Sequence, residues 1–180
     1  MSWVRIPLGP PYFPVSAGFF YYYIMDKTVL RNRYKIIRLK MSTDEVVSKS
    51  QAICGRALAT IELTKVKNLS VYEPLAKLNE VDASLFISEI RHKYPDIEIR
   101  VMGSAKNQRL PRQKFDLIIV PTLAFDANNY RLGWGGGFYD RFLAGQPQAL
   151  KIGLCFQKGF IKEGLTQEPH DIPLDAVITD

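Results

Sequence analysis

The stretch Leu117–Asp140 reads LIIVPTLAFDANNYRLGWGGGFYD, and it decides the fold class of this 180-residue chain. Its first four residues form a continuous apolar run that Pro121 stops, which is typical of a central parallel strand buried on both faces. A long glycine-rich connection follows over 121–137, and a helix is expected to begin with Phe138–Leu143. A buried strand followed by a helix is typical of an α/β protein.

The same alternation extends to both sides of this stretch. Ser42 and Glu45 form a capping box at the start of the second expected helix. The basic, polar residues 103–114 are expected to form a surface loop. We therefore predict an α/β domain of three layers, with a mainly parallel sheet and helices on both faces, as a single domain over 25–180. The expected helices span 27–40, 43–63, and 82 to just before Pro95, and the expected strands span 69–73, 97–102, 151–156 and 176–179.

The composition is that of an ordinary globular domain. Hydrophobic residues make up 47% of the chain, which excludes a disordered chain. The two cysteines, Cys54 and Cys155, lie far apart and form no CxxC motif, so a disulfide framework is not expected and a reducing cytoplasm is the expected compartment. The net charge of +6 permits anionic partners but selects none.

Residues 1–24 differ from the rest of the chain. Arg5 is their only charged residue, and they contain four prolines and the run FFYYYI over 19–24. Prolines break the apolar helix that a membrane span requires. We interpret 1–24 as a non-core extension upstream of a start at Met25. A docking tail and a membrane anchor are the alternatives.

The glycine-rich connection carries the main chemical signal. Gly133, Gly135, Gly136 and Gly137 leave backbone N–H groups free of side-chain cover just before a helix, which favours anion binding. Arg131 adds a cation suited to phosphate oxygens, and Asp140 is placed to hold a metal. The spacing matches neither a Walker loop nor a Rossmann fingerprint. A flexible glycine turn, with Asp140 as a helix-start residue, is the alternative.

A second acidic point lies at Glu168-Pro-His170-Asp171. Asp171 precedes the last strand and can reach the same sheet edge as Asp140. A carboxylate pair with phosphate oxygens and waters is a common Mg²⁺ site. A solvated surface turn is the alternative. The chain lacks GxSxG and HExxH motifs, and covalent catalysis has no support in the sequence.

The stretch Asp116–Asp140 resembles the signature of the 5-formyltetrahydrofolate cyclo-ligase family, also called 5,10-methenyltetrahydrofolate synthetase. Further matches to the family are found along most of 25–180, and they support a start at Met25. They are Lys27-x-x-x-Arg31, Arg38, Met41-Ser42, Lys49-Ser50, Tyr72, Glu80-Val-Asp82, His170-Asp171 and Leu174–Thr179.

The resemblance implies an ATP- and Mg²⁺-dependent cyclisation of 5-formyltetrahydrofolate to 5,10-methenyltetrahydrofolate, with release of ADP and phosphate. Arg131 and Tyr139 are the residues expected to act in catalysis. Asp140 and Asp171 are expected to bind Mg²⁺. The expected ATP contacts are Lys27, Arg31, Arg131, Leu132, Gly133, Trp134, Gly135, Gly136, Gly137, Phe138 and Tyr139. The expected folate contacts are Leu75, Glu80, Trp134, Gly135, Gly136, Gly137 and Phe138.

The chain departs from the family pattern at four places. Thr122 and Asn129 stand where the family usually has glycine, and Thr166 stands at a common proline position. The segment 103–115 is shorter than usual, so it is open whether this segment still completes the folate site. Its basic residues could attract the glutamate tail of a folate, although a solvated loop is the alternative; they are Lys106, Arg109, Arg112 and Lys114.

Two other functions compete with the cyclo-ligase. One is a non-catalytic relative that binds nucleotide or folate as a regulatory module. The other is a basic RNA-associated protein that uses the 103–114 loop, which lacks the aromatic and basic interleaving of known RNA modules. We expect a monomer with 5-formyltetrahydrofolate and ATP as partners, and no nucleic-acid or membrane partner.

Overall fold

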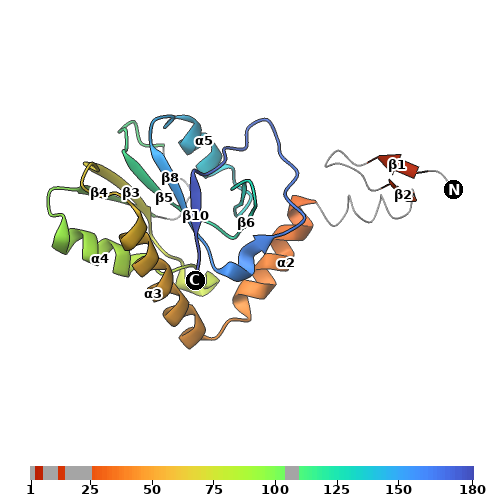
Figure 1. Cartoon of the computed structure of the whole chain (residues 1–180), viewed down its shortest axis with the longest axis horizontal. Helices are drawn as coiled ribbons and strands as arrows, with labels where there is room; N and C mark the ends of the chain where they lie inside the picture. The colour runs from red at the N-terminus through yellow and green to blue at the C-terminus, as the bar shows by residue number, and fades with distance from the viewer. Residues whose placement is uncertain (1–2, 6–11, 15–25, 104–109) are drawn as a thin grey trace.

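The computed structural model describes residues 3–5, 12–14, 26–103 and 110–180 (Figure 1). In the N-terminal region, β1 (Trp3–Arg5) and β2 (Tyr12–Pro14) pair as an antiparallel two-stranded sheet separate from the other sheets. The rest of the predicted extension, the predicted start at Met25, and the loop residues Lys106 and Arg109 lie outside the described residues.

The central element is a five-stranded sheet in which every neighbouring pair is parallel. The strands follow the order β10-β8-β5-β3-β4 across the sheet, which confirms the predicted α/β class. The chain adds β4 on one side of β3, but adds β8 and then β10 on the far side of β5, so the strand order reverses between β3 and β5. Ligands of open α/β sheets bind beyond the carboxyl ends of the strands at such a reversal. The five strands are β3 (Asn68–Tyr72), β4 (Glu98–Met102), β5 (Leu117–Pro121), β8 (Leu150–Leu154) and β10 (Ala176–Ile178).

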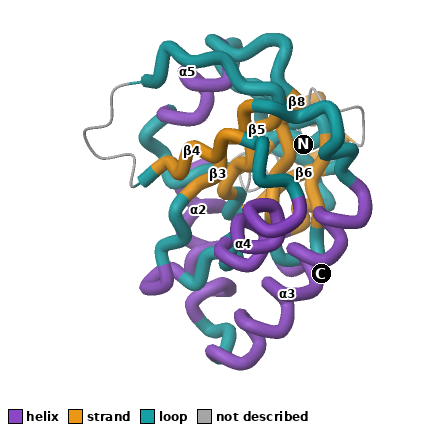
Figure 2. The backbone as a smooth tube through the Cα atoms, turned by 90° about the vertical axis from the view of Figure 1, so that its left-hand side faces the viewer, coloured by secondary structure: helices purple, strands orange, loops and turns teal. Residues whose placement is uncertain are grey.

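Strand β5 has a hydrophobic core on each of its faces. Leu117 and Ile119 belong to the core under α3 (Thr43–Thr60) and α4 (Ser84–Lys93). Ile118 and Val120 belong to a second core under α5 (Phe138–Ala144). This alternation follows from the two-residue period of a strand, and it confirms the three layers seen in Figures 1 and 2.

A second, smaller sheet lies beside the main one, and the sequence did not predict it. It contains β6 (Ala124–Asp126), β7 (Arg131–Leu132) and β9 (Phe160–Ile161), in the order β7-β6-β9. Strands of two or three residues are too short to show an alternating pattern, so 121–137 was predicted as a connection. Helix α2 (Lys27–Leu39) packs on this sheet through the buried Leu30 and Tyr34. The 3₁₀ turns η1 (Ala76–Leu78) and η2 (Gln157–Gly159) complete the described elements.

The helix boundaries agree with the predictions to within a few residues. The Ser42 hydroxyl accepts a hydrogen bond from the Glu45 backbone N–H at 3.2 Å, which confirms Ser42 as the N-cap of α3. Helix α3 ends at Thr60, three residues before the predicted end. Asp82 accepts from the Ser84 backbone N–H, while the N-cap position itself is Ala83. None of the helices that the structure describes has both the length and the apolar character of a membrane span.

Gly55 is expected to limit the stability of α3. It lies inside this helix, and a Cβ built on it would meet nothing within 4 Å. Since glycine costs about 1 kcal/mol relative to alanine in a helix, Gly55→Ala should raise the free energy of unfolding by about 0.5–1 kcal/mol in urea titrations. Gly164→Ala is the matched control and should be destabilising, because Gly164 has a φ of +83°. Equal effects at the two positions would contradict this account.

Candidate active site

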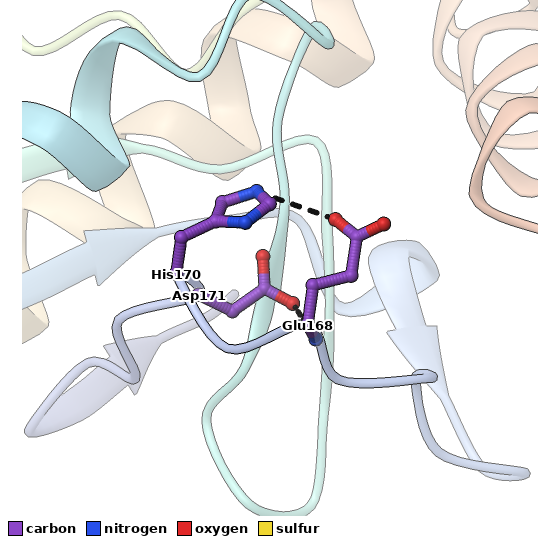
Figure 3. Close-up of side chains that lie close together, drawn as sticks. All are labelled: Glu168, His170 and Asp171. Carbon is purple, nitrogen blue, oxygen red and sulfur yellow. Dashed lines mark hydrogen bonds and ion pairs between the residues drawn. The ribbon is translucent and has the colours of Figure 1, made fainter.

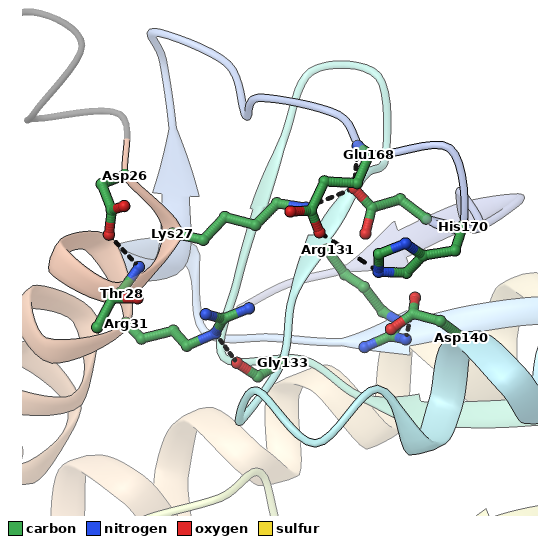
Figure 4. Close-up of polar contacts among 10 residues, drawn as sticks. Asp26, Lys27, Thr28, Arg31, Arg131, Gly133, Asp140, Glu168 and His170 are labelled. Carbon is green, nitrogen blue, oxygen red and sulfur yellow. Dashed lines mark hydrogen bonds and ion pairs between the residues drawn. The ribbon is translucent and has the colours of Figure 1, made fainter.

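A cavity of about 830 Å³ lies beyond the carboxyl end of β5. Much of its wall comes from the start of α2, the glycine loop (residues 133–137) with its flanking residues, and the stretch 166–171 before β10 (Figure 4). Leu75 and Leu78 at η1, and Pro121 at the end of β5, also line it. Most of the predicted site residues line it, namely Lys27, Arg31, Leu75, Arg131, Gly133, Trp134, Gly135, Gly136, Gly137, Phe138, Tyr139, Asp140 and Asp171. Residues far apart in the sequence therefore meet in one place.

The glycine loop exposes its backbone to this cavity. Gly135 and Gly137 have φ values of +99° and +61°, which L-residues with side chains rarely adopt. Within the described residues, the N–H groups of 133–137 have no hydrogen-bond acceptor. Consecutive free amides beside a cavity form a concave binding surface for an anion.

An ion pair joins β7, which precedes the glycine loop, to α5, which follows it. Arg131 Nη2 donates to Asp140 Oδ1 at 2.8 Å, and the Arg131 side chain is only 5% exposed. Burial lowers the pKa of the Arg131 guanidinium from its ordinary value, and the Asp140 carboxylate opposes this shift. Arg131 Nε is buried without an acceptor among the described residues. The guanidinium is thus only partly satisfied by the protein, as suits a group that binds an anion.

Helix α2 supplies two further cations. Arg31 Nε donates to the Gly133 carbonyl oxygen at 3.2 Å, and a Cβ on Gly135 would lie 3.5 Å from the same Arg31 nitrogen. Lys27 Nζ donates to Glu168 Oε2 at 3.2 Å and also to Asp171. The start of α2 is therefore tied to both the glycine loop and the segment before β10.

The surroundings of Asp171 favour its carboxylate form. Burial alone would raise its pKa, but the hydrogen bonds from Lys27 and from the Glu168 backbone N–H outweigh burial and hold the pKa below its ordinary value. Glu168, His170 and Asp171 each offer a ligand atom, and these atoms lie within 4.8 Å of one another (Figure 3).

The donor set fits a hard divalent cation. Carboxylate oxygens are the ligands that Mg²⁺ prefers, and Asp140, Glu168 and Asp171 supply them on the wall of one cavity. Asp140 is not part of the close cluster formed by Glu168, His170 and Asp171, and its carboxylate pairs with Arg131 instead. The predicted pairing of Asp140 with Asp171 around one Mg²⁺ therefore stays a prediction.

Tyr139 is buried on the cavity side of α5, and its surroundings disfavour the phenolate form. Burial raises the pKa of its phenol well above the ordinary value. The ring also lies beside the guanidinium of Arg131, with 5.6 Å between Cζ and the ring centre. A neutral phenol can donate its proton in a hydrogen bond to an oxygen that gains negative charge.

Two predicted site residues are not on the cavity wall. Leu132 is buried in the core that α2 covers. Glu80 is 5% exposed and lies behind Leu75 and Trp134, which donate hydrogen bonds to its two carboxylate oxygens.

Several wall residues were not predicted as site residues from the sequence. No motif singled most of them out, although Glu168 and His170 belong to the acidic point already noted. They are Asp26, Thr28, Leu78, Pro121, Arg141, Thr166, Glu168 and His170.

The fold and the cavity together define an α/β protein with a cavity, lined by glycine backbone and cationic side chains, at the carboxyl edge of a parallel sheet. The model of the 5-formyltetrahydrofolate cyclo-ligase family matches residues 98–180. The chain is 34% identical over 168 residues to 5-formyltetrahydrofolate cyclo-ligase from Mycoplasma pneumoniae, with 87% of this chain and 99% of the relative covered. The Mycoplasma genitalium cyclo-ligase is 28% identical over 165 residues.

Solved structures agree with this relationship. A 5,10-methenyltetrahydrofolate synthetase from Mycoplasma pneumoniae superposes with a TM-score of 0.70 at 26% identity, over 86% of this chain and 98% of that one. The synthetase from Aquifex aeolicus gives a TM-score of 0.69 at 25% identity, over 85% and 89% of the two chains. The chain therefore belongs to the 5-formyltetrahydrofolate cyclo-ligase family, which is a family of enzymes.

The Arg131 side chain is expected to require glycine at position 133. A Cβ on Gly133 would lie 2.9 Å from Arg131 Nη1, and the buried guanidinium has little room to move. Gly133→Ala should therefore lower the free energy of unfolding by about 1–3 kcal/mol in urea titrations. Gly136→Ala is the matched control, because its Cβ would meet nothing within 4 Å. If Gly133→Ala were as stable as the control, Arg131 would not be held as described.

Proposed function

We propose that the enzyme uses ATP and Mg²⁺ to cyclise 5-formyltetrahydrofolate to 5,10-methenyltetrahydrofolate, with release of ADP and phosphate. Family membership supports the cyclo-ligase activity. The observation that carries the ATP requirement is the glycine loop, whose free amides line a cavity together with three cations. Such a surface suits the phosphates of a nucleotide.

In this proposal, the phosphates lie on the glycine loop. Backbone N–H groups of 133–137 donate to phosphate oxygens, and Lys27, Arg31 and Arg131 neutralise their charge. Since phosphoryl transfer is catalysed mainly by positioning and by charge stabilisation, no protein nucleophile is needed. Glycine at 135 and 136 allows the phosphates to approach the backbone closely.

The folate lies across the cavity from the phosphates, against Leu75 and Trp134. Its formyl oxygen attacks the terminal phosphorus of ATP, and ADP leaves. The second folate nitrogen then attacks the activated formyl carbon and loses its proton, the carbon–oxygen bond breaks, and phosphate departs with that oxygen. Tyr139 and Arg131 are placed to donate hydrogen bonds to oxygens that gain negative charge in these steps.

Asp140 and Asp171 are the proposed Mg²⁺ ligands, and Glu168 is a further carboxylate within reach of Asp171. Bound Mg²⁺ would neutralise phosphate charge next to these carboxylates. Asp140 can keep its contact with Arg131 through one oxygen, because a carboxylate has two oxygens and several lone pairs.

Removing the ion pair is expected to abolish turnover. With 5-formyltetrahydrofolate, Mg²⁺ and ATP, the wild type should produce the absorbance of the methenyl product. Arg131→Ala and Asp140→Ala should each lower kcat at least ~100-fold, because charge stabilisation at the reacting phosphate is lost. The exposed residues Arg91 and Asp96 give matched controls, Arg91→Ala and Asp96→Ala, which should stay within twofold. Ligand binding without product in the wild type would instead favour the regulatory module.

Chelation tests the metal requirement. Treatment with EDTA should stop product formation, and excess Mg²⁺ should restore it, because the carboxylates at the phosphate site then regain their cation. The unfolding midpoint should change little, since the three cores contain no metal ligand. Full activity after chelation would contradict the proposed role of Asp140 and Asp171.

A further inference from the structure

Asp126 is a buried carboxylate that the proposed reaction does not use. It is the last residue of β6, it is 1% exposed, and it does not line the cavity. All the donors that the structure describes for this carboxylate are backbone N–H groups. Burying a carboxylate without a cationic partner is costly unless its hydrogen bonds are well made, so these bonds constrain the segments that supply them.

The two oxygens of this carboxylate bond to different segments. Oδ1 accepts from the backbone N–H groups of Asn128 and Tyr130, both at 3.0 Å, in the turn between β6 and β7. Oδ2 accepts from the backbone N–H group of Leu165 at 3.0 Å. Leu165 begins the acidic segment (residues 165–174), which carries Glu168 and Asp171. The carboxylate therefore joins the turn to the acidic segment.

The acidic segment depends on such contacts for its position, because it contains neither helix nor strand. At its far end, the Leu174 backbone N–H group donates to the Asn129 carbonyl oxygen at 3.1 Å, in the same turn that Asp126 closes. The turn thus holds the acidic segment at both ends. Strand β7 follows this turn directly, with Arg131 as its first residue.

Between these two ends, the metal-binding candidates Glu168 and Asp171 are bonded to each other. The Glu168 backbone N–H donates to Asp171 Oδ2 at 2.7 Å, and the Asp171 backbone N–H donates to the Glu168 carbonyl oxygen at 2.9 Å. These bonds fix the two residues relative to each other, but not relative to the glycine loop. The turn that Asp126 closes is a backbone connection between these carboxylates and Arg131.

We propose that Asp126 is a positioning residue, which holds the carboxylates of Glu168 and Asp171 at a fixed place relative to Arg131. This inference rests on the proposed function, in which carboxylates of the acidic segment bind Mg²⁺ next to phosphates on the glycine loop. Asp126 contacts neither the phosphates nor the metal, and it acts through the backbone of the acidic segment. Its loss should weaken the contribution of Mg²⁺ to nucleotide binding and leave the glycine loop intact.

The test is Asp126→Asn, with the binding of a non-hydrolysable ATP analogue measured by calorimetry in EDTA and in excess Mg²⁺. The asparagine oxygen can keep the two bonds to the turn, while its NH₂ group then faces the Leu165 N–H group, which is also a donor. In EDTA, the variant should bind the analogue within twofold of the wild type. Excess Mg²⁺ should strengthen binding by the wild type, and this gain should be at least ~10-fold smaller in the variant.

Two further variants are the controls for this measurement. Asp171→Ala removes a proposed ligand and should lose the same Mg²⁺ gain. Ile90→Ala removes apolar volume from the core under α3 and α4, so it should lower stability and keep the gain in full. Thermal unfolding should show that each variant is folded at the temperature of the titration.

A measurement on the wild type tests the bond to Leu165 without any substitution. The Leu165 amide should exchange slowly with solvent, because it is buried and bonded to a carboxylate. The amide of the exposed Gln167, which has no acceptor among the described residues, should exchange fast. Equal exchange rates at the two amides would overturn the inference, whether or not Asp126→Asn folds.

The other results are distinct. An unchanged Mg²⁺ gain in Asp126→Asn would overturn the inference and leave the proposed function intact. Weaker binding of this variant in EDTA would also overturn it, because Asp126 would then shape the glycine loop. Loss of the gain in Ile90→Ala would show general damage and contradict positioning. A wild type without any Mg²⁺ gain would refute the proposed metal site and this inference with it, whereas a wild type with the gain but no product would refute the proposed reaction alone.

Discussion

The Arg131–Asp140 ion pair is the constraint on which the site depends. The pair brackets the glycine loop by joining Arg131 of β7, before the loop, to Asp140 of α5, after it, with the guanidinium almost fully buried. Removing one member would leave an uncompensated buried charge, which typically costs 3–5 kcal/mol. With the flanking elements fixed, Gly135 and Gly137 keep their positive φ values on the cavity wall. The same ion pair therefore constrains the conformation of the glycine loop and places a guanidinium beside it.

Two buried polar side chains hold the remaining walls to this loop. Arg38 of α2 donates to the carbonyl oxygens of Thr122 and Leu123, which fixes the helix that carries Lys27 and Arg31. Asp126 is 1% exposed and accepts from backbone N–H groups of Asn128, Tyr130 and Leu165. It thereby links the hairpin of β6 and β7 to the segment that leads to Asp171. The site is assembled by polar contacts to backbone, whereas the sheet below it is assembled by apolar packing.

The sequence was most informative where a pattern is long. The run at 117–120 and the alternation of helices and strands predicted the parallel sheet, and the glycine loop predicted the cavity wall. Asn129, which stands where the family usually has glycine, has a φ of +61°, a left-handed conformation that asparagine tolerates better than most residues. The small sheet and the placement of Glu80 behind the wall were not predictable, because they depend on short strands and on side-chain contacts across the chain. Lys27 and Arg31 were expected at the site only because of the resemblance to the family. Two basic residues four positions apart would by themselves fit a solvent-exposed helix face equally well.

The central claim is that the free amides of the glycine loop bind phosphate, and ¹⁵N-resolved NMR of the backbone tests it most directly. Adding a non-hydrolysable ATP analogue with Mg²⁺ should shift the amide resonances of Gly135, Gly136 and Gly137 and slow their hydrogen exchange. The amides of Gly55 and Gly103, which lie outside the cavity wall, should not change. Binding of the analogue with the loop resonances unchanged would contradict the account.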